Sequence, residues 1–414
     1  MTSDNRKRIF IAIHYLELGG AEMSLIGLLH ALDYSRYEVD LMVYSHRGEL
    51  MEMIPKEVNV LPEISEYAQI ERPMSEVLKS GYWHIVLARL KAKWQYHRYA
   101  RRTHPDEGSA IFQYVDDAVC PFLPTLHHLG EYDLAISYVT PHRIVAEKVL
   151  AKCKAAWIHT DYSYIDTDVE RELPVWSRYD HIVSISKDVT TSFCKKFPTL
   201  GSRIEELHNI LSPSFVRQRA EVISNEELEK EMPRTEGVVN LLSVGRFSHA
   251  KNYDNIPTIC RMTNDLLKEK SCGVREVRWY IIGYGGGETL IRQRIAEEGM
   301  EGQVRILGKR ANPYPYIRAC DIYAQPSRFE GRSVTVREAQ VLCKPVVVTR
   351  YATAGSQIND GVDGVIVGMD NEACAKGIAA LVTDKALQQR LKEYLSCHDY
   401  GDEKEAEKID LLFE

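Results

Sequence analysis

The chain has 414 residues, of which 44% are hydrophobic and 27% charged, the composition of a globular protein with two or more domains. A net charge of −7 argues against a dedicated nucleic-acid binder. The nine cysteines include no Cys-x-x-Cys pair, which argues against a disulfide framework and a zinc site and indicates a reducing compartment.

No apolar run approaches the roughly 18 residues that a membrane-spanning helix needs. The polar residues 2–8 also lack the charged, apolar and small-residue zones of a signal peptide. The sequence therefore predicts a cytoplasmic protein and leaves open a peripheral contact with the inner face of the plasma membrane.

The first half of the chain alternates between apolar runs and helical patterns. An apolar run at 8–16 leads into Gly19-Gly20 and then into four leucines spaced for one helical face: Leu25, Leu28, Leu29 and Leu32. Further strands are predicted at 37–44, 58–61, 132–138, 155–158 and 181–185, and helices over 143–151 and from an N-cap at Ser186 to residue 197. This alternation predicts a parallel sheet with helices on both faces.

Residues 84–104 form a block of unusual composition. It holds six Lys and Arg residues, three histidines and three aromatic residues, and no acid. Two interpretations stay open: a basic helix that lies on an anionic membrane surface, or a solvated helix in a variable part of a domain.

The second half repeats the alternation after a charged connection at 218–237 that lacks a core pattern. Strands are predicted at 238–244, 277–282, 304–307, 322–325 and 346–349, and helices at 371–383, 386–395 and 402–413. Two such βα domains predict a ligand at the carboxyl ends of the strands, in the cleft between the domains.

Two acids, Glu330 and Glu338, lie eight residues apart around a predicted helix start. The first N–H groups of a helix have no partner within it and suit an anion, so both acids could face one ligand. Residues 335–338 also fit a capping box, which would make Glu338 structural. The segment alone leaves both interpretations open.

Three further positions at strand ends carry candidate chemistry. Arg246 and Lys251 follow the strand at 238–244 and could neutralise a pyrophosphate without a metal, or be ordinary surface cations. His159 follows the strand at 155–158 and could donate a hydrogen bond or carry a proton, or be a satisfied histidine at a domain edge.

Two glycine-rich turns also follow predicted strands. Gly19-Gly20 could bring the backbone close to a phosphate, or serve turn geometry alone. Residues 283–287 lack a complete Gly-x-Gly-x-x-Gly, which argues against nicotinamide binding. The sequence contains no nucleophile elbow, no Walker loop and no His-x-x-x-His spacing for a metal.

The order of the motifs is more specific than any one of them. Gly-Gly-Ala-Glu (19–22) is followed by Trp-Ile-His-Thr-Asp-Tyr-Ser (157–163), Ser-Val-Gly-Arg-Phe (243–247), Ile-Gly-Tyr-Gly (282–285), Val-Arg-Ile-Leu-Gly (304–308), Glu-x7-Glu and Lys-Pro-Val-Val-Val (344–348). This series resembles the retaining glycosyltransferases of family 4, especially bacterial enzymes that assemble cell-surface polysaccharides. The resemblance covers nearly the whole chain and is most specific from Leu241 to Val367.

The resemblance implies the GT-B fold, an α/β architecture with two Rossmann-like domains that face each other across a cleft. It implies an acceptor-binding domain at 1–208, a nucleotide-sugar-binding domain at 209–386, and C-terminal helices at 387–414 that cross back onto the first domain. The implied reaction moves a hexosyl group from a nucleotide-diphosphate sugar to a saccharide or lipid-linked saccharide, with retention of configuration and without a metal. By family frequency the donor is a UDP-sugar.

The resemblance also implies residue roles. Glu330 matches the acid that contacts the donor sugar, and Glu338 the acid that binds the ribose. The other matches are Arg246 and Lys251 on the diphosphate, His159 near the reacting sugar, Gly19 and Gly20 in a loop over the phosphates, Arg310 near the base, and the backbone of Gly331, Arg332, Ser333 and Val334 on the donor. The family often has an aromatic residue and a second glycine where this chain has Arg332 and Ser333, so the donor sugar stays open.

Two other functions stay open. A nucleotide-sugar 2-epimerase shares this architecture and would turn over a donor without any acceptor. A non-catalytic partner of a transferase complex would also fit the fold, although the intact Glu330, Glu338, Arg246 and Lys251 argue against it.

Overall fold

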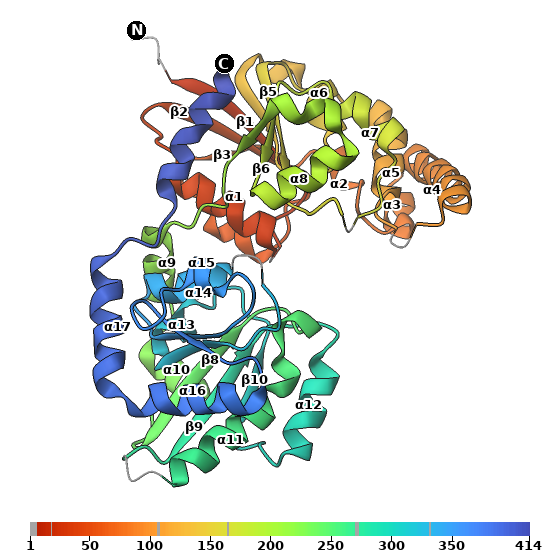
Figure 1. The fold of residues 1–414 in the computed structure, drawn as a ribbon. Coiled ribbons are helices and arrows are strands. Elements are labelled where there is room, and N and C mark those ends of the chain that lie inside the picture. The colour runs from red at the N-terminus through yellow and green to blue at the C-terminus, as the bar shows by residue number, and fades with distance from the viewer. Residues whose placement is uncertain (1–5, 18, 106–107, 164, 270–272, 331–332) are drawn as a thin grey trace. The chain divides into compact units, whose positions relative to one another are not determined.

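The computed structural model describes residues 6–17, 19–105, 108–163, 165–269, 273–330 and 333–414. The chain divides into two compact units, which Figure 1 traces from the N-terminus to the C-terminus. Unit 1 comprises Met1–Ile210 and Asp402–Glu414, and unit 2 comprises Leu211–Gly401. The sequence-based boundary lay between residues 208 and 209.

Unit 1 is built on a parallel sheet of seven strands in the order β3-β2-β1-β4-β5-β6-β7. The strands are β1 (Lys7–Ile13), β2 (Tyr37–Val43), β3 (Asn59–Val60), β4 (Tyr132–Ser137), β5 (Ala151–Ile158), β6 (His181–Ser184) and β7 (Ile204–Glu206). The chain runs outward from β1 to β3 and then returns to place β4 beside β1. The carboxyl ends of β1 and β4 therefore flank the topological switch point, where open α/β sheets bind ligands.

The α-helices of unit 1 include one in each predicted helical segment, and four others among the described residues were not predicted. The α-helices are α1 (Gly20–Ala31), α2 (Ser65–Ala68), α3 (Met74–Lys79), α4 (Trp83–Thr103), α5 (Ile111–Val119), α6 (Arg143–Lys148), α7 (Val169–Trp176) and α8 (Lys187–Lys196), with 3-10 turns at Glu49–Met53, Cys120–Phe122, His127–Leu129 and Pro198–Arg203. The four leucines of the α1 segment are buried. Ser186 caps α8 by accepting a hydrogen bond from the Val189 amide at 3.3 Å, as predicted. The helix predicted at 143–151 ends earlier, because Ala151 already pairs with β4 as the first residue of β5.

The connection out of unit 1 packs closely on α1. A side chain at Gly27 would bring its Cβ within 2.1 Å of the Ile210 carbonyl oxygen, so this contact requires glycine. The Ser24 hydroxyl donates to Asn209 Oδ1 at 2.8 Å. Asn209 thus has a structural partner in α1.

The C-terminal segment returns to unit 1 as the 3-10 helix η7 (Glu403–Phe413). Its Ile409 and Leu412 are fully buried. Arg36 pairs with Asp410 at 2.6 Å, and the Phe413 ring stacks on Tyr37 with centroids 5.9 Å apart. Of the segment 387–414 that was expected to cross back, only residues 402–414 belong to unit 1.

Unit 2 is built on a second parallel sheet, with six strands in the order β10-β9-β8-β11-β12-β13. The strands are β8 (Val238–Val244), β9 (Glu276–Ile282), β10 (Val304–Gly308), β11 (Ile322–Gln325), β12 (Val346–Thr349) and β13 (Val365–Val367). The order reverses between β8 and β11, so the carboxyl ends of these two neighbours form the switch point of this sheet.

The helices of unit 2 are α9 (Pro213–Ala220), α10 (Asn225–Glu231), α11 (Ile256–Lys268), α12 (Glu288–Glu297), α13 (Tyr314–Ala319), α14 (Val334–Val341), α15 (Ala354–Gln357), α16 (Asn371–Thr383) and α17 (Lys385–Cys397), with 3-10 turns at His249–Lys251 and Tyr253–Asn255. Residues 218–237, predicted to be a charged connection into the second domain without a core pattern, lie within unit 2 and contribute buried residues to it. Ser224 caps α10 within this segment, and Leu228 and Met232 are buried.

The glycine-rich turn after β9 has a packing role. A Cβ at Gly283 would lie 1.9 Å from the Gly245 carbonyl oxygen, and one at Gly287 would lie 2.8 Å from that of Phe247. Gly283 also has a φ of +154°. These glycines let the turn after β9 press against the loop after β8, which carries Arg246 and Lys251.

Candidate functional site

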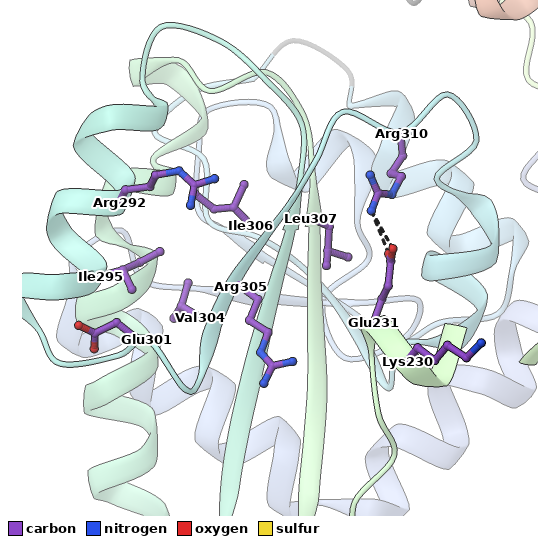
Figure 2. Close-up of a pocket in the computed structure, with 10 residues that line it drawn as sticks. All are labelled: Lys230, Glu231, Arg292, Ile295, Glu301, Val304, Arg305, Ile306, Leu307 and Arg310. Atoms are coloured by element: carbon purple, nitrogen blue, oxygen red, sulfur yellow. Dashed lines mark hydrogen bonds and ion pairs between the residues drawn. The ribbon is translucent and has the colours of Figure 1, made fainter. Parts of the chain in front are cut away.

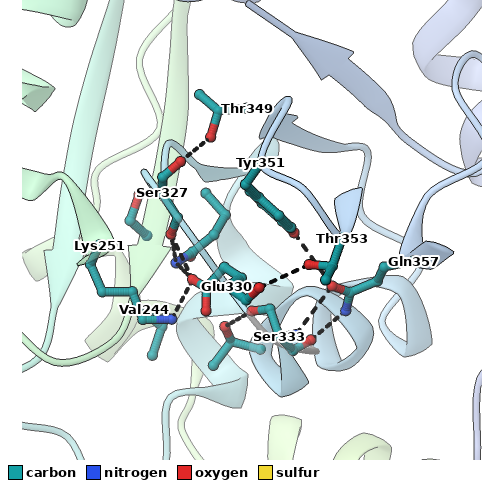
Figure 3. A network of polar contacts seen from close by, with 12 residues as sticks. Val244, Lys251, Ser327, Glu330, Ser333, Thr349, Tyr351, Thr353 and Gln357 are labelled. Carbon is teal, nitrogen blue, oxygen red and sulfur yellow. Dashed lines mark hydrogen bonds and ion pairs between the residues drawn. The ribbon is translucent and has the colours of Figure 1, made fainter. Parts of the chain in front are cut away.

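The loops that leave β8 and β11 meet at the switch point of unit 2. Lys251, in the loop after β8, places its Nζ 2.6 Å from Oε1 of Glu330, in the loop after β11 (Figure 3). The two side chains retain only 20% and 11% of their exposure. The structure therefore brings together two of the predicted site residues, which lie 79 residues apart in the chain.

A network of short contacts fixes the Glu330 carboxylate. Ser327 Oγ donates to Oε1 at 2.6 Å, and Gln325 Nε2 donates to the same oxygen at 3.0 Å. Thr353 Oγ1 donates to the Glu330 carbonyl at 2.9 Å. Oε2 accepts no hydrogen bond from any residue that the structure describes, so this oxygen can accept from a ligand hydroxyl.

The two loops are tied to each other beside this pair. Arg328 forms a bidentate ion pair with Asp254, with nitrogen–oxygen distances of 2.8 and 2.9 Å. Burial raises the pKa of Asp254, but the Arg328 guanidinium outweighs it and the pKa is lowered. Asn252, whose φ is +61°, donates a hydrogen bond from its side-chain Nδ2 to the Pro326 carbonyl oxygen at 2.9 Å. Lys251 and Glu330 are thus positioned before any ligand arrives.

Helix α14 begins at Val334, four residues after Glu330 in the chain. Its N-cap Ser333 makes no side-chain capping bond, and the Ser333 amide donates to Gln357 Oε1 at 3.1 Å (Figure 3). Val334, the first residue of the helix, is 44% exposed. Gly331 and Arg332, whose backbones were predicted to bind the donor, lie outside the described residues.

The capping-box interpretation of Glu338 is wrong. The helix begins at Val334, so Thr335 lies inside it and cannot be the N-cap. The Glu338 carboxyl is 5% exposed and accepts a hydrogen bond from Tyr314 Oη at 2.9 Å. Burial raises the pKa of Glu338 from 4.5 to about 7, against the opposing effect of the Tyr314 bond. The carboxyl therefore changes protonation near neutral pH.

This pKa makes a prediction about stability. Between pH 4.5 and 7 the folded chain holds a proton on Glu338 that the unfolded chain has lost, so the free energy of unfolding falls as pH rises through this window. The effect is on the order of 3 kcal/mol. Glu338→Gln should flatten this dependence in urea denaturation at pH 5, 6, 7 and 8. The exposed Glu229→Gln variant is the matched control, and equal slopes in both variants would contradict the prediction.

Two other predicted site residues form no hydrogen bond or ion pair with Lys251 or Glu330 among the described residues. Arg246 is exposed and forms no ion pair with the residues that are described. Arg310 pairs with Glu231 at 3.0 Å and donates to Tyr316 Oη at 3.0 Å. It lines a hollow of about 560 Å³ beside the edge strand β10 (Figure 2). A nucleotide base bound in this region would have to share the Arg310 guanidinium with the Glu231 carboxylate.

In unit 1, His159 follows β5, and its ring centroid lies 4.7 Å from that of Tyr138. Neither ring nitrogen is exposed or hydrogen-bonded within the described part of the chain. Burial lowers the pKa of His159 to about 4, so the ring is neutral at pH 7. Gly19 is the N-cap of α1 in an extended conformation, and a Cβ at Gly20 would touch nothing. Backbone geometry therefore does not require Gly20.

A histidine–carboxylate pair that no sequence motif indicated lies at the switch point of unit 1. His14 directly follows β1 and is 8% exposed. Its Nδ1 contacts Oε1 of Glu71, while Nε2 is buried without a partner among the described residues. Burial raises the pKa of Glu71, but the bond to His14 together with the positive charges of His14, Arg47 and Arg89 outweighs burial, and the pKa is lowered. The separation of 57 positions in the chain explains why no local pattern indicated this pair.

The described ranges contain neither a candidate metal cluster nor a candidate membrane-spanning helix. No group of three or more His, Cys, Asp and Glu side chains there could hold a metal ion. No helix there has both the length and the apolar character to cross a membrane.

Residues 224–396 match the family described as "Glycosyl transferases group 1". The matched segment contains Arg246, Lys251, Glu330 and Glu338, and with them the whole switch point of unit 2.

Curated bacterial proteins resemble part of the chain. An N-acetylgalactosamine-N,N'-diacetylbacillosaminyl-diphospho-undecaprenol 4-alpha-N-acetylgalactosaminyltransferase of Campylobacter jejuni is 25% identical over 221 residues, 53% of this chain and 55% of the relative. The lipopolysaccharide core biosynthesis glycosyltransferase LpsE of Rhizobium meliloti is 25% identical over 201 residues, 47% of this chain and 55% of LpsE. The chain thus spans about half the length of these relatives.

Solved structures resemble the chain over its full length. HepE of Anabaena, in complex with UDP-glucose, has a TM-score of 0.60 at 16% identity and covers 98% of this chain and 100% of HepE. A TarM variant of S. aureus has a TM-score of 0.63 at 13% identity, and the match covers 99% of this chain and 100% of TarM. At this identity the likeness shows the fold. The chain has the GT-B fold of two Rossmann-like α/β domains, as predicted.

Proposed function

We propose that this chain is a retaining, family 4 hexosyltransferase that acts without a metal ion. It moves a sugar from a nucleotide-diphosphate donor, a UDP-sugar, to a saccharide or lipid-linked saccharide in bacterial surface polysaccharide synthesis. The observation that carries this proposal is the Lys251–Glu330 pair at the switch point of the segment that matches the group 1 family. The undecaprenol-linked acceptor in the name of the Campylobacter relative and the UDP-glucose bound by HepE support the choice of substrates.

The donor would bind in unit 2. Lys251 has three N–H donors and can keep its bond to Glu330 while it donates to the diphosphate, and Arg246 is exposed for a second contact. The N–H groups that begin α14 would add to these charges. Oε2 of Glu330 would accept from a sugar hydroxyl, and Glu338 from the ribose. Arg310 would contact the base, and the backbone of Gly331, Arg332, Ser333 and Val334 the donor.

The acceptor would bind groups of unit 1. The bond between C1 of the sugar and the phosphate oxygen breaks, and its electron pair stays with the leaving diphosphate, which Lys251 and Arg246 stabilise. The acceptor oxygen forms the new bond to C1 from the same face, and its proton passes to the leaving phosphate oxygen. His159, neutral at pH 7, would hydrogen-bond to the reacting sugar, and Gly19 and Gly20 would lie over the phosphates.

A thermal-shift screen of UDP-, GDP- and ADP-sugars tests this function. A ligand at 100 times its Kd stabilises the folded chain by about 2.7 kcal/mol, so the correct donor should raise the Tm by several degrees. No shift with any nucleotide sugar would contradict the proposal. The bound donor is then incubated alone, and its conversion without an acceptor would identify an epimerase instead.

A further inference from the structure

Helix α4 is joined to unit 1 by a narrow face only. It is 21 residues long, and it packs on α5 and α3 at the edge of the unit (Figure 1). The residues that it buries are Ile85, Ala88 and Ala92, which are small or of moderate size. Most of the helix surface is therefore left for another contact.

The opposite face of α4 carries an exposed apolar stripe, which comprises Trp83, Leu87, Leu90 and Trp94. Their exposed fractions are 62%, 56%, 46% and 58%. The spacings of four, three and four residues place all four side chains on one helical face. Such a stripe would normally be buried in the core, and here unit 1 leaves it uncovered.

Cations surround the apolar stripe. At 100° per residue, Lys91 and Arg98 fall on one flank of the stripe and Lys93 on the other, while Arg101 continues its line toward the C-terminus. All four side chains are exposed, and none forms an ion pair with a residue in the described ranges. Arg98 lies over the Trp94 ring at 4.9 Å. The helix contains no acid, although the chain as a whole carries a charge of −7.

These features select one class of partner. A second copy of the chain would bring like charges together around the stripe, which opposes self-association. An anionic bilayer instead offers acyl chains to the leucines, a headgroup layer to the tryptophans and lipid phosphates to the cations. Phe122, 49% exposed and 5.5 Å from the His84 ring, extends the apolar surface at the N-terminal end of α4.

We propose that α4 docks the chain on an anionic lipid bilayer, with the apolar stripe inserted at headgroup depth and Lys91, Lys93, Arg98 and Arg101 facing lipid phosphates. Among the two interpretations that the sequence left open, the exposed stripe favours the membrane surface over a solvated helix. The docking does not depend on the proposed function, because lipid binding can be measured without any sugar transfer.

Co-sedimentation of the full chain with vesicles tests the docking. Vesicles of phosphatidylcholine alone are compared with vesicles that contain phosphatidylglycerol at a molar ratio of about 7:3, in low and high salt. We expect binding to the anionic vesicles, and at least a tenfold loss of affinity in high salt. Lys91→Glu with Arg98→Glu, and separately Trp83→Ser with Trp94→Ser, should each weaken binding at least tenfold.

Matched variants and a solution measurement complete the test. Leu290→Ser with Lys392→Glu changes one exposed apolar residue and one exposed cation of unit 2, and should bind like the wild type. Equal melting curves by circular dichroism confirm that the variants are folded. Unchanged lipid binding in both α4 variants would overturn the proposal. So would sedimentation velocity that shows stripe-dependent self-association of a chain that does not bind vesicles.

Discussion

Lys251→Ala is expected to lower kcat/KM for sugar transfer by a factor on the order of 10³ while the chain stays folded. The substitution removes the cation that contacts Glu330 at 2.6 Å and that we place on the leaving diphosphate. Charge that develops on the leaving group then lacks its nearest fixed partner. Initial rates with the donor found in the thermal-shift screen measure the effect.

The matched control for this variant is Lys392→Ala, which removes an exposed lysine elsewhere in unit 2. It should leave kcat/KM within about twofold of the wild type. Glu330→Gln keeps the shape of the side chain and its bonds from Ser327 and Gln325, and should lower transfer strongly without loss of folding. Normal transfer in both Lys251→Ala and Glu330→Gln would refute the proposed donor site.

Ile409→Ala is expected to lower the free energy of unfolding of unit 1 by about 3 kcal/mol. Ile409 lies in η7 and has no exposed surface, so truncation leaves a cavity against unit 1. Deletion of residues 402–414 should cost more, because it also removes Leu412, the Arg36–Asp410 ion pair and the ring stack on Tyr37. Urea denaturation followed by circular dichroism measures both effects.

Leu411→Ala gives a control within the same helix. Leu411 is 46% exposed, so its truncation should change the free energy of unfolding by less than about 1 kcal/mol. Equal losses for Ile409→Ala and Leu411→Ala, or a normal melt after deletion of 402–414, would show that η7 does not stabilise unit 1.

Much of the fold could be predicted because the local spacing of apolar residues indicates which faces of the helices and strands are buried. The α1 leucines mark a buried helical face, and the predicted helix at 371–383 coincides with α16. The segment 218–237 was misread because α10 buries only Leu228, so charged residues hide its periodicity. The C-terminal helices at 387–414 were taken as one group, although only tertiary contacts decide that α17 stays in unit 2 and η7 returns to unit 1.

The site could be predicted where its residues belong to a motif. Glu330 and Lys251 were both predicted, but their direct contact could not be, because it joins loops that leave different strands. The burial of Glu338 beside Tyr314 could not be predicted either, because this contact joins the separate helices α13 and α14. The local Thr-x-x-Glu pattern suggested a capping box instead. His14 and Glu71 belong to no motif and meet only in the folded chain.

The roles assigned to Arg246, Arg310, Gly19, Gly20 and His159 stay predictions. Arg246 has the exposure that a phosphate contact needs, whereas Arg310 is held by Glu231. Calorimetric titration with UDP would show whether substitution of each residue weakens nucleotide binding. A loss of UDP affinity in Arg246→Ala would support a contact to the diphosphate. A loss of UDP affinity in Arg310→Ala would support a contact to the base.

Isothermal titration of the full chain with UDP, GDP and ADP tests the donor site most directly. We expect the wild type to bind one of these nucleotides. Lys251→Ala should weaken this binding at least tenfold, whereas Lys392→Ala should leave it unchanged. Equal affinity in the wild type and Lys251→Ala, or no binding of any of the three, would contradict a nucleotide-diphosphate site at the Lys251–Glu330 pair.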